Sequence, residues 1–266
     1  MGKKIAFFDI DGTMVNVPNG MHHPTSETMR VLEEFKKQGN YIVIASARGS
    51  APGSVKDIDF DGYIFCDGHY IIFNDEIWID EIFTEKEVEK QMELYEKYNG
   101  KPTFCGHNRV WCNCVDDPMV IDHREMFSGT RERPTGQIEE FTASDVDAIS
   151  CCVLFETVEQ LKACYKEMEE EFTMVPYYTG LIRMDVYRKG FTKGTACEYM
   201  YKKLGISKDN TYAFGDGIND KEMITLVGHG IAMGNGLEEI KAIADDVTDT
   251  VDNDGIAKAF KKYFNI

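Results

Sequence analysis

The chain has 266 residues, 43% of them apolar, and a formal net charge of −17. That length allows one large domain or two of ordinary size. The acidic balance argues against nucleic acid as a general partner, because a negative surface repels phosphate backbones. No apolar run is long enough to cross a bilayer and no signal-peptide core follows Met1, so we expect a soluble, cytoplasmic protein without membrane contact.

The first strand is expected at residues 3–8, where apolar β-branched and aromatic residues follow two lysines. It ends in the acidic motif Asp9-Ile10-Asp11-Gly12-Thr13. Side chains at the carboxyl end of a strand face the crevice in which open α/β sheets bind ligands. Two acids one residue apart fit a divalent-cation site, and one of them could also attack phosphorus. A plain Asp-Gly turn is the alternative for this motif taken alone.

A helix and a second strand come next. The segment Pro24-Thr25-Ser26 predicts a helix start, and Gly39 predicts its end. Residues 41–45 are nearly all apolar, as in a parallel strand buried on both faces. This strand ends at Ser46, whose hydroxyl could donate a hydrogen bond to a phosphate oxygen or merely cap the next segment. Strand, helix and strand together predict a βαβ unit.

The middle of the chain predicts a second, inserted domain. Residues 63–66 are expected to form a third strand, and residues 70–73 and 77–79 a hairpin. From about residue 83 the pattern changes to charged helices and short strands, and residues 128–147 show little periodicity. We expect residues 82–188 to form an α+β domain inserted into an α/β domain made of residues 1–81 and 189–266. Within the insertion, helices are expected at 84–98, from Asp117-Pro118 and from Thr157, and strands at 103–105, 110–114, 149–155, 174–178 and 181–187.

Lys193 lies in the first turn of a helix that should run to Leu204 after an N-cap at Thr192. A positive charge is unfavourable at a helix N-terminus, where negative charge is preferred. A bound phosphate would explain the lysine, whereas an ordinary surface lysine is the alternative.

A second acidic motif follows the apolar strand expected at residues 211–214. It reads Gly215-Asp216-Gly217-Ile218-Asn219-Asp220. The glycines allow a tight backbone around Asp216, and both Asp216 and Asp220 offer the hard oxygen ligands that magnesium takes. A further strand at 231–233, a helix from Leu237, a short strand at 246–247 and a terminal helix at 256–264 complete the expected layer.

The eight cysteines form no compact spacing pattern, and we expect free thiols. The sharpest alternative is a zinc site made of Cys105, His107, Cys112 and Cys114, although the paired C-x₂₋₄-C spacing of structural zinc sites is missing.

Taken together, the acidic motif at residues 9–13, Ser46, Lys193 and the motif at residues 215–220 resemble the haloacid dehalogenase (HAD) superfamily. Within it, the order and spacing are similar to those of Cof-type phosphatases with a large α/β (C2-type) cap. The resemblance covers the whole chain. It implies a Rossmann-like, doubly wound, mostly parallel sheet with an inserted α+β cap domain.

The resemblance also implies a role for each motif residue. Asp9 would be the nucleophile that forms an aspartyl-phosphate, and Asp11 the general acid and base. Magnesium would lie between Asp9, the backbone carbonyl of Asp11, and Asp216, with Asp220 nearby. Ser46, Lys193 and Asn219 would hold the phosphoryl group. Uncatalysed phosphate-monoester hydrolysis is slow enough for enzymes to supply up to ~10²¹-fold, which is too much for one group.

The implied function is a Mg²⁺-dependent phosphatase of small phosphorylated metabolites such as sugar phosphates. A phosphomutase or phosphotransferase of the same superfamily, a non-enzymatic phospho-acceptor and a redox or zinc module remain alternatives. Two positions depart from the family pattern: relatives usually carry Gly where this chain has Ala47, and often Asn where it has Asp67. Cap residues Tyr177, Tyr178, Arg183 and Asp185 receive no role, and the oligomeric state stays open.

Overall fold

The computed structural model describes residues 2–266. The chain forms two compact units, one made of the segments up to Ile79 and from Phe191 onward, the other of Asp80–Gly190. Within residues 2–266, no helix combines the length and the apolar character that a bilayer crossing demands.

The first unit is built on an eight-stranded sheet in the order β14-β13-β12-β1-β2-β3-β4-β5. Neighbouring strands are parallel from β14 to β3, and β4 runs antiparallel to β3. The central strands are apolar on both sides because both faces of the sheet are covered. The strands are β1 (Ile5–Phe8), β2 (Tyr41–Ala45), β3 (Gly62–Phe65), β4 (Tyr70–Phe73), β5 (Glu76–Asp80), β12 (Thr211–Gly215), β13 (His229–Ala232) and β14 (Asp246–Val247).

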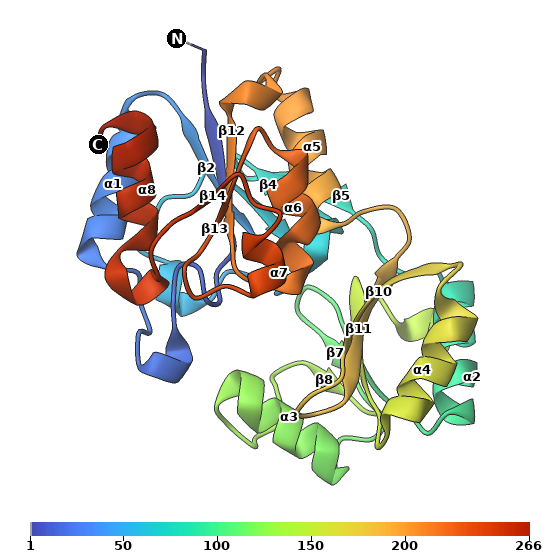
Figure 1. Ribbon diagram of the computed structural model, residues 1–266. Helices are drawn as coiled ribbons and strands as arrows, with labels where there is room; N and C mark the ends of the chain where they lie inside the picture. Colours follow the sequence, from blue (N-terminus) through green and yellow to red (C-terminus); the bar gives the residue numbers. More distant parts are fainter. Residues whose placement is uncertain (1) are drawn as a thin grey trace. The chain divides into compact units, whose positions relative to one another are not determined.

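Helices cover both faces of this sheet. Figure 1 shows α1 and α8 together on one face and α5 and α6 on the other. On the first face Phe8 and Phe35 pack against Phe260, and on the second Phe7 and Met200 belong to one core cluster. This is the doubly wound α/β fold that the sequence predicts. The helices are α1 (Ser26–Lys37), α5 (Lys193–Lys203), α6 (Lys221–Leu226), α7 (Glu238–Lys241) and α8 (Gly255–Phe264).

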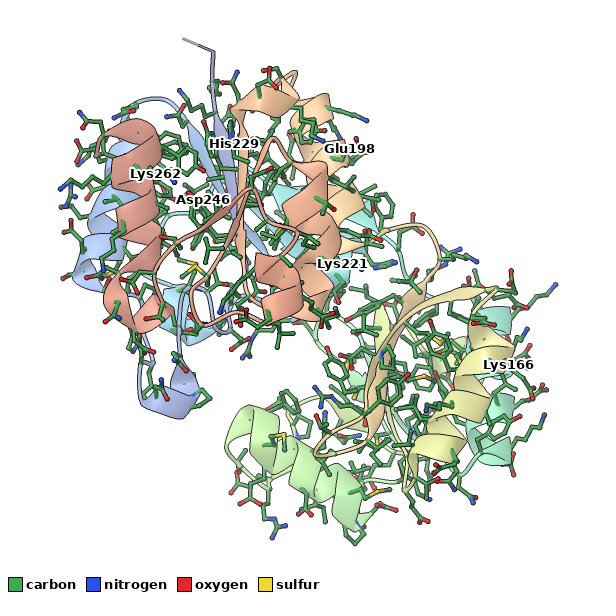
Figure 2. All side chains as sticks on the ribbon, viewed as in Figure 1. Lys166, Glu198, Lys221, His229, Asp246 and Lys262 are labelled. Carbon is green, nitrogen blue, oxygen red and sulfur yellow. The ribbon has the colours of Figure 1, made fainter. Side chains whose placement is uncertain are left out.

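The terminal helix also has a charged side. Lys262 of α8 forms an ion pair with Asp246 at the start of β14, with Nζ 2.6 Å from Oδ2, and Figure 2 labels both residues. Such partly exposed pairs contribute little to the free energy of unfolding. The aromatic contacts beneath α8 therefore contribute more than this ion pair to the packing of the helix on the sheet.

The second unit has a mixed six-stranded sheet in the order β10-β11-β9-β6-β7-β8. Helices α2 and α4 bury Val88, Leu94 and Leu161 in its main core cluster, while α3 joins a smaller cluster around Leu154. The elements are α2 (Glu85–Lys97), β6 (Lys101–Cys105), β7 (Val110–Trp111), α3 (Pro118–Ser128), β8 (Gln137–Ile138), β9 (Ser150–Leu154), α4 (Val158–Met168), β10 (Phe172–Tyr177) and β11 (Arg183–Arg188).

Capping residues fix the helix starts as the sequence predicts, whereas three other details differ. Thr84, Thr157 and Thr192 cap α2, α4 and α5 through their side chains. The helix expected from Leu237 is a single turn. The strand expected to reach residue 114 stops at Trp111, because a turn from Cys114 to Asp117 follows it. The segment expected to lack periodicity holds the two-residue strand β8, which pairs with β7.

Candidate active site

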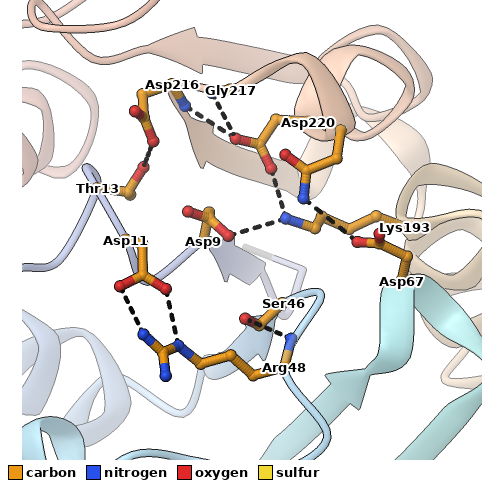
Figure 3. Close-up of polar contacts among 11 residues, drawn as sticks. Asp9, Asp11, Thr13, Ser46, Arg48, Asp67, Lys193, Asp216, Gly217 and Asp220 are labelled. Atoms are coloured by element: carbon orange, nitrogen blue, oxygen red, sulfur yellow. Dashed lines mark hydrogen bonds and ion pairs between the residues drawn. The ribbon is translucent and has the colours of Figure 1, made fainter. Parts of the chain in front are cut away.

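Four segments meet at the carboxyl edge of the parallel sheet. Asp9 directly follows β1, Ser46 follows β2, Asp67 follows β3 and Asp216 follows β12 (Figure 3). The Asp9 amide extends the ladder by donating to the carbonyl of Phe214 at 3.0 Å. Because parallel strands end at one edge, residues more than 200 positions apart in the sequence become neighbours.

Lys193 is the central cation of this edge. It is 1% exposed, and its Nζ donates to Oδ1 of Asp9 at 2.8 Å and to Oδ1 of Asp220 at 2.7 Å. Burial alone would lower the pKa of Lys193, but attraction to Asp220 and Asp9 outweighs it and raises that pKa well above its ordinary value. The lysine at a helix N-terminus is therefore compensated by two carboxylates rather than by solvent.

Asp9, Asp216 and Asp220 form the acidic group of the site. Each offers an oxygen, and these three oxygens lie within 4.8 Å of one another, far inside the separation of roughly 10 Å that would exclude a shared ion. The packing is tight, since a Cβ on Gly12, whose φ is +86°, would lie 2.2 Å from Oδ2 of Asp216. Thr13 donates to the other Asp216 oxygen at 3.2 Å.

Crowding of buried carboxylates perturbs their titration. Burial, followed by repulsion from Asp220 and Asp216 and opposed by Lys193, raises the pKa of Asp9 well above its ordinary value. Burial and then the charge of Asp220 raise the pKa of Asp216 to about 6. One ammonium cannot neutralise three carboxylates, so an oxygen-seeking divalent cation fits this group.

Asp220 differs from the other two acids because both of its oxygens are already engaged. Oδ1 accepts from Lys193, and Oδ2 accepts from the amides of Asp216 and Gly217 at 2.9 and 3.0 Å. Its first structural task is therefore to hold the lysine and the turn that carries Asp216.

Asp11 points away from the acidic group and pairs with Arg48. The guanidinium donates to both carboxylate oxygens, from Nε at 2.7 Å and from the second terminal nitrogen at 2.9 Å. The pair is partly exposed, with 52% of the Asp11 side chain and 39% of the Arg48 side chain accessible. Sequence reasoning assigned no role to Arg48, since spacing does not show that a residue 37 positions away meets Asp11.

Ser46 is held beneath the site by its backbone. Its amide donates to the Ile64 carbonyl at 2.8 Å, its carbonyl accepts from the Asp67 amide, and its hydroxyl oxygen accepts from the Arg48 amide at 3.2 Å. The hydroxyl keeps its own proton for donation. The side chain is 2% exposed.

Asn219 contacts Asp67, the residue at which this chain departs from the Asn that relatives often carry. Its Nδ2 donates to Oδ1 of Asp67 at 3.3 Å. Asp67 is 4% exposed, has a φ of +48°, and its Oδ2 has no hydrogen-bond partner among the described residues. Burial raises the pKa of Asp67, while Lys193 and Asn219 oppose that shift. Asp67 thus adds a further carboxyl group close to Lys193.

The alternative zinc site is not assembled. Cys112 and Cys114 lie 3.6 Å apart, but Cys105 bonds to the Thr103 carbonyl and His107 to Asp80. Among residues 2–266, the acidic group around Asp9 is the one cluster of three or more potential metal ligands.

Comparisons with known proteins identify the family of this chain. A family model described as haloacid dehalogenase-like hydrolase matches residues 6–260. Phosphatase YwpJ of Bacillus subtilis is 39% identical over 286 residues, covering 97% of this chain and 99% of YwpJ. YkrA of the same organism is 28% identical over 271 residues, covering 98% of each chain.

Solved structures show the same fold. One reported as the HAD subclass IIB sugar phosphatase BT4131 superimposes with a TM-score of 0.84 at 28% identity, covering 99% of this chain and all of that one. The family model spans nearly the whole chain, and the fold agrees over the same length. This chain therefore belongs to the haloacid dehalogenase-like hydrolases.

Proposed function

We propose that this chain is a Mg²⁺-dependent phosphohydrolase of small phosphorylated metabolites, sugar phosphates among them, acting through an aspartyl-phosphate intermediate. The observation that carries the proposal is the meeting of Asp9, Lys193 and Asp216 at one sheet edge. The relatives support the reaction class, since YwpJ is named a phosphatase and BT4131 is titled a sugar phosphatase.

Asp9, Asp216 and the backbone carbonyl of Asp11 would hold the magnesium ion, with Asp220 behind them. All are oxygen donors, and a bound cation would offset the burial and charge repulsion that raise the pKa of Asp9 and of Asp216. When bound, Mg²⁺ supplies the positive charge that lets an anionic nucleophile approach an anionic phosphoryl group.

The residues of this chain divide the reaction into two displacements. An Asp9 oxygen attacks phosphorus, the ester P–O bond breaks, and Asp11 gives its proton to the leaving oxygen. Asp11 then takes a proton from water as that water attacks phosphorus, which regenerates Asp9 and releases inorganic phosphate. Asp11 must leave Arg48 for these transfers, which its partial exposure permits.

The phosphoryl group would be held by Lys193, Ser46 and Asn219. Lys193 already lies at 2.8 Å from the proposed nucleophile, and the Ser46 hydroxyl proton is available. We propose that residues 1–81 and 189–266 form the catalytic core and that residues 82–188 select the leaving group. The two compact units, which divide near Ile79 and Phe191, support this assignment.

The cellular setting is part of the proposal. The eight cysteines follow no compact spacing pattern, which fits free thiols in a reducing compartment. We propose the cytoplasm, with water-soluble metabolites as substrates.

A phosphate-release screen tests the function. Metabolite monoesters are offered with Mg²⁺ and no acceptor to the wild type, to Asp9→Asn, and to Asp57→Asn as a control at an exposed acid. We expect release by the wild type and the control but not by Asp9→Asn. Normal turnover of Asp9→Asn would overturn the nucleophile assignment. Transfer that needs an acceptor ester would favour the phosphomutase alternative.

A further inference from the structure

The buried carboxyl group of Asp67 in the first unit is only half satisfied by hydrogen bonds. Its Oδ1 accepts from Nδ2 of Asn219 at 3.3 Å, whereas its buried Oδ2 has no hydrogen-bond partner among residues 2–266. A buried oxygen without a partner costs folding free energy, and the cost is greater when the carboxyl group is ionised. Stability alone therefore does not account for an aspartate at this position.

The backbone holds Asp67 in a turn of three consecutive left-handed residues. The φ angles of residues 66, 67 and 68 are +50°, +48° and +109°. Left-handed residues other than glycine are strained and are found most often at functional sites. The Asp67 amide donates to the Ser46 carbonyl at 3.2 Å, and a Cβ on Gly68 would lie 2.6 Å from the carbonyl oxygen of Thr192. The turn is therefore fixed between the end of β2 and the start of α5.

This turn brings Asp67 to two of the residues that are proposed to hold the phosphoryl group. Figure 3 shows its carboxyl group beside Lys193 and bonded to the Asn219 amide. The Asn219 oxygen faces the other way, since a Cβ on Gly217 would lie 3.0 Å from it. Asp67 therefore fixes which end of the Asn219 amide points into the site, and the second N–H of Nδ2 stays available for an anion.

The charges around Asp67 make its own ionisation sensitive to a bound anion. Burial raises the pKa of Asp67, Lys193 on α5 and Asn219 oppose that shift, and repulsion from Asp220 adds to it. His69, in the same turn, has a smaller opposing effect, and its Nδ1 lies 2.9 Å from a backbone carbonyl. An anionic phosphoryl group at Lys193 and Asn219 would add negative charge to this buried space, where charges interact strongly. An ionised Asp67 would oppose that binding, and a neutral Asp67 would not.

We propose that Asp67 is a positioning residue that orients the Asn219 amide and takes up one proton from solvent when a phosphoryl group binds. The proton resides on Oδ2, because Oδ1 keeps accepting from Asn219, and it returns to solvent when the anion leaves. The identification of that anion as the phosphoryl group of a substrate rests on the proposed phosphohydrolase function, whereas proton uptake with inorganic phosphate does not.

Calorimetry with inorganic phosphate and Mg²⁺, in buffers of different ionisation enthalpy, tests the proton uptake. Asp67→Asn keeps the shape and tolerates the left-handed backbone, but it cannot titrate. Between the pKa of Asp67 in the free protein and its higher pKa in the complex, the wild type should take up as much as one proton more than Asp67→Asn. Its phosphate affinity should there fall up to about tenfold more per pH unit. The ionisation of phosphate itself is common to both proteins, and Asp57→Asn, at an exposed acid, should match the wild type. Equal uptake by the wild type and Asp67→Asn at every pH from about 5 to 9 would overturn the coupling.

Ester kinetics test the orientation of Asn219. Asp67→Ala removes the acceptor, so KM should rise about tenfold at every pH, with kcat changed less. Asp67→Asn retains an acceptor oxygen and should recover most of that loss. Equal KM values for the two variants would overturn the positioning role. Proton uptake without phosphate release from any ester would reject the phosphohydrolase function and keep the role of Asp67, whereas release with equal uptake would do the reverse. A wild type that binds no phosphate would overturn both.

Discussion

The two units differ most in what they bury. The first unit buries charged side chains, among them Asp9, Lys193 and Asp220, at the edge of a parallel sheet. Among the described residues of the second unit no charged side chain is buried, and the buried polar groups are the Gln91 amide, tyrosine hydroxyls, the Trp111 indole and thiols. Burying a charge costs folding free energy unless the charge is paired. The concentration of buried charges in the first unit therefore indicates a functional site there.

After the loss of the proposed nucleophile, the loss of the proposed acid and base should reduce turnover most. Asp11→Asn should reduce turnover about 10²- to 10⁴-fold, because proton transfer to the leaving oxygen and from water is lost. If the second displacement slows more than the first, phosphorylated enzyme accumulates and is visible in the intact mass. The control variant Asp57→Asn, at an exposed acid, should retain full turnover. An undiminished rate for Asp11→Asn would exclude Asp11 as the general acid and base.

Breaking the buried charge network should cost more stability than any surface change. Asp220→Ala leaves Lys193 with one carboxylate partner and leaves the amides of Asp216 and Gly217 unpaired. We expect the free energy of unfolding to fall by about 3–5 kcal/mol, measured by urea unfolding. Asp220→Asn retains an acceptor and should lose less. Equal losses for the two variants would contradict this account.

A core truncation in the second unit should separate stability from chemistry. Leu161 of α4 is fully buried in the main core cluster. Leu161→Ala should cost about 2–5 kcal/mol through lost contacts and a cavity. Because the acidic group is in the other unit, the stabilisation by Mg²⁺ described next should persist, as followed by thermal unfolding. Its disappearance in Leu161→Ala would show that the two units are not independent in this respect.

Magnesium should stabilise the first unit through the acidic group. At about 100 times its dissociation constant, a ligand that binds only the folded state adds about 2.7 kcal/mol. The gain should appear as a rise in Tm that a chelator reverses. Asp216→Asn removes one ligand and should lose most of the rise, while Asp57→Asn should keep it. An identical rise in all three proteins would place the ion elsewhere.

The exposed pair between Asp11 and Arg48 should matter least for stability. Both side chains are well exposed, and such pairs contribute less than about 1 kcal/mol. We therefore expect Arg48→Met to unfold within that range of the wild type in urea. A loss above about 2 kcal/mol would show that the pair is part of the buried network after all.

Much of this architecture follows from local patterns. Apolar β-branched runs predict β1, β2 and β12, and threonine caps predict the starts of α2, α4 and α5. The two acidic motifs and their spacing indicate the family, which the family model confirms over residues 6–260. These features are predictable because strand alternation, helix capping and motif spacing act over a few neighbouring residues.

Contacts between distant segments were decided by the tertiary structure. The sequence by itself determined the strands, the helix caps and the acids at the strand ends. It did not determine three contacts. Lys193 lies between Asp9 and Asp220, Arg48 forms an ion pair with Asp11, and β8 pairs with β7. Each depends on where the sheet brings strand ends together and on which side chains then share one buried volume. Burial makes such pairs strong, and burial exists only after the chain has folded.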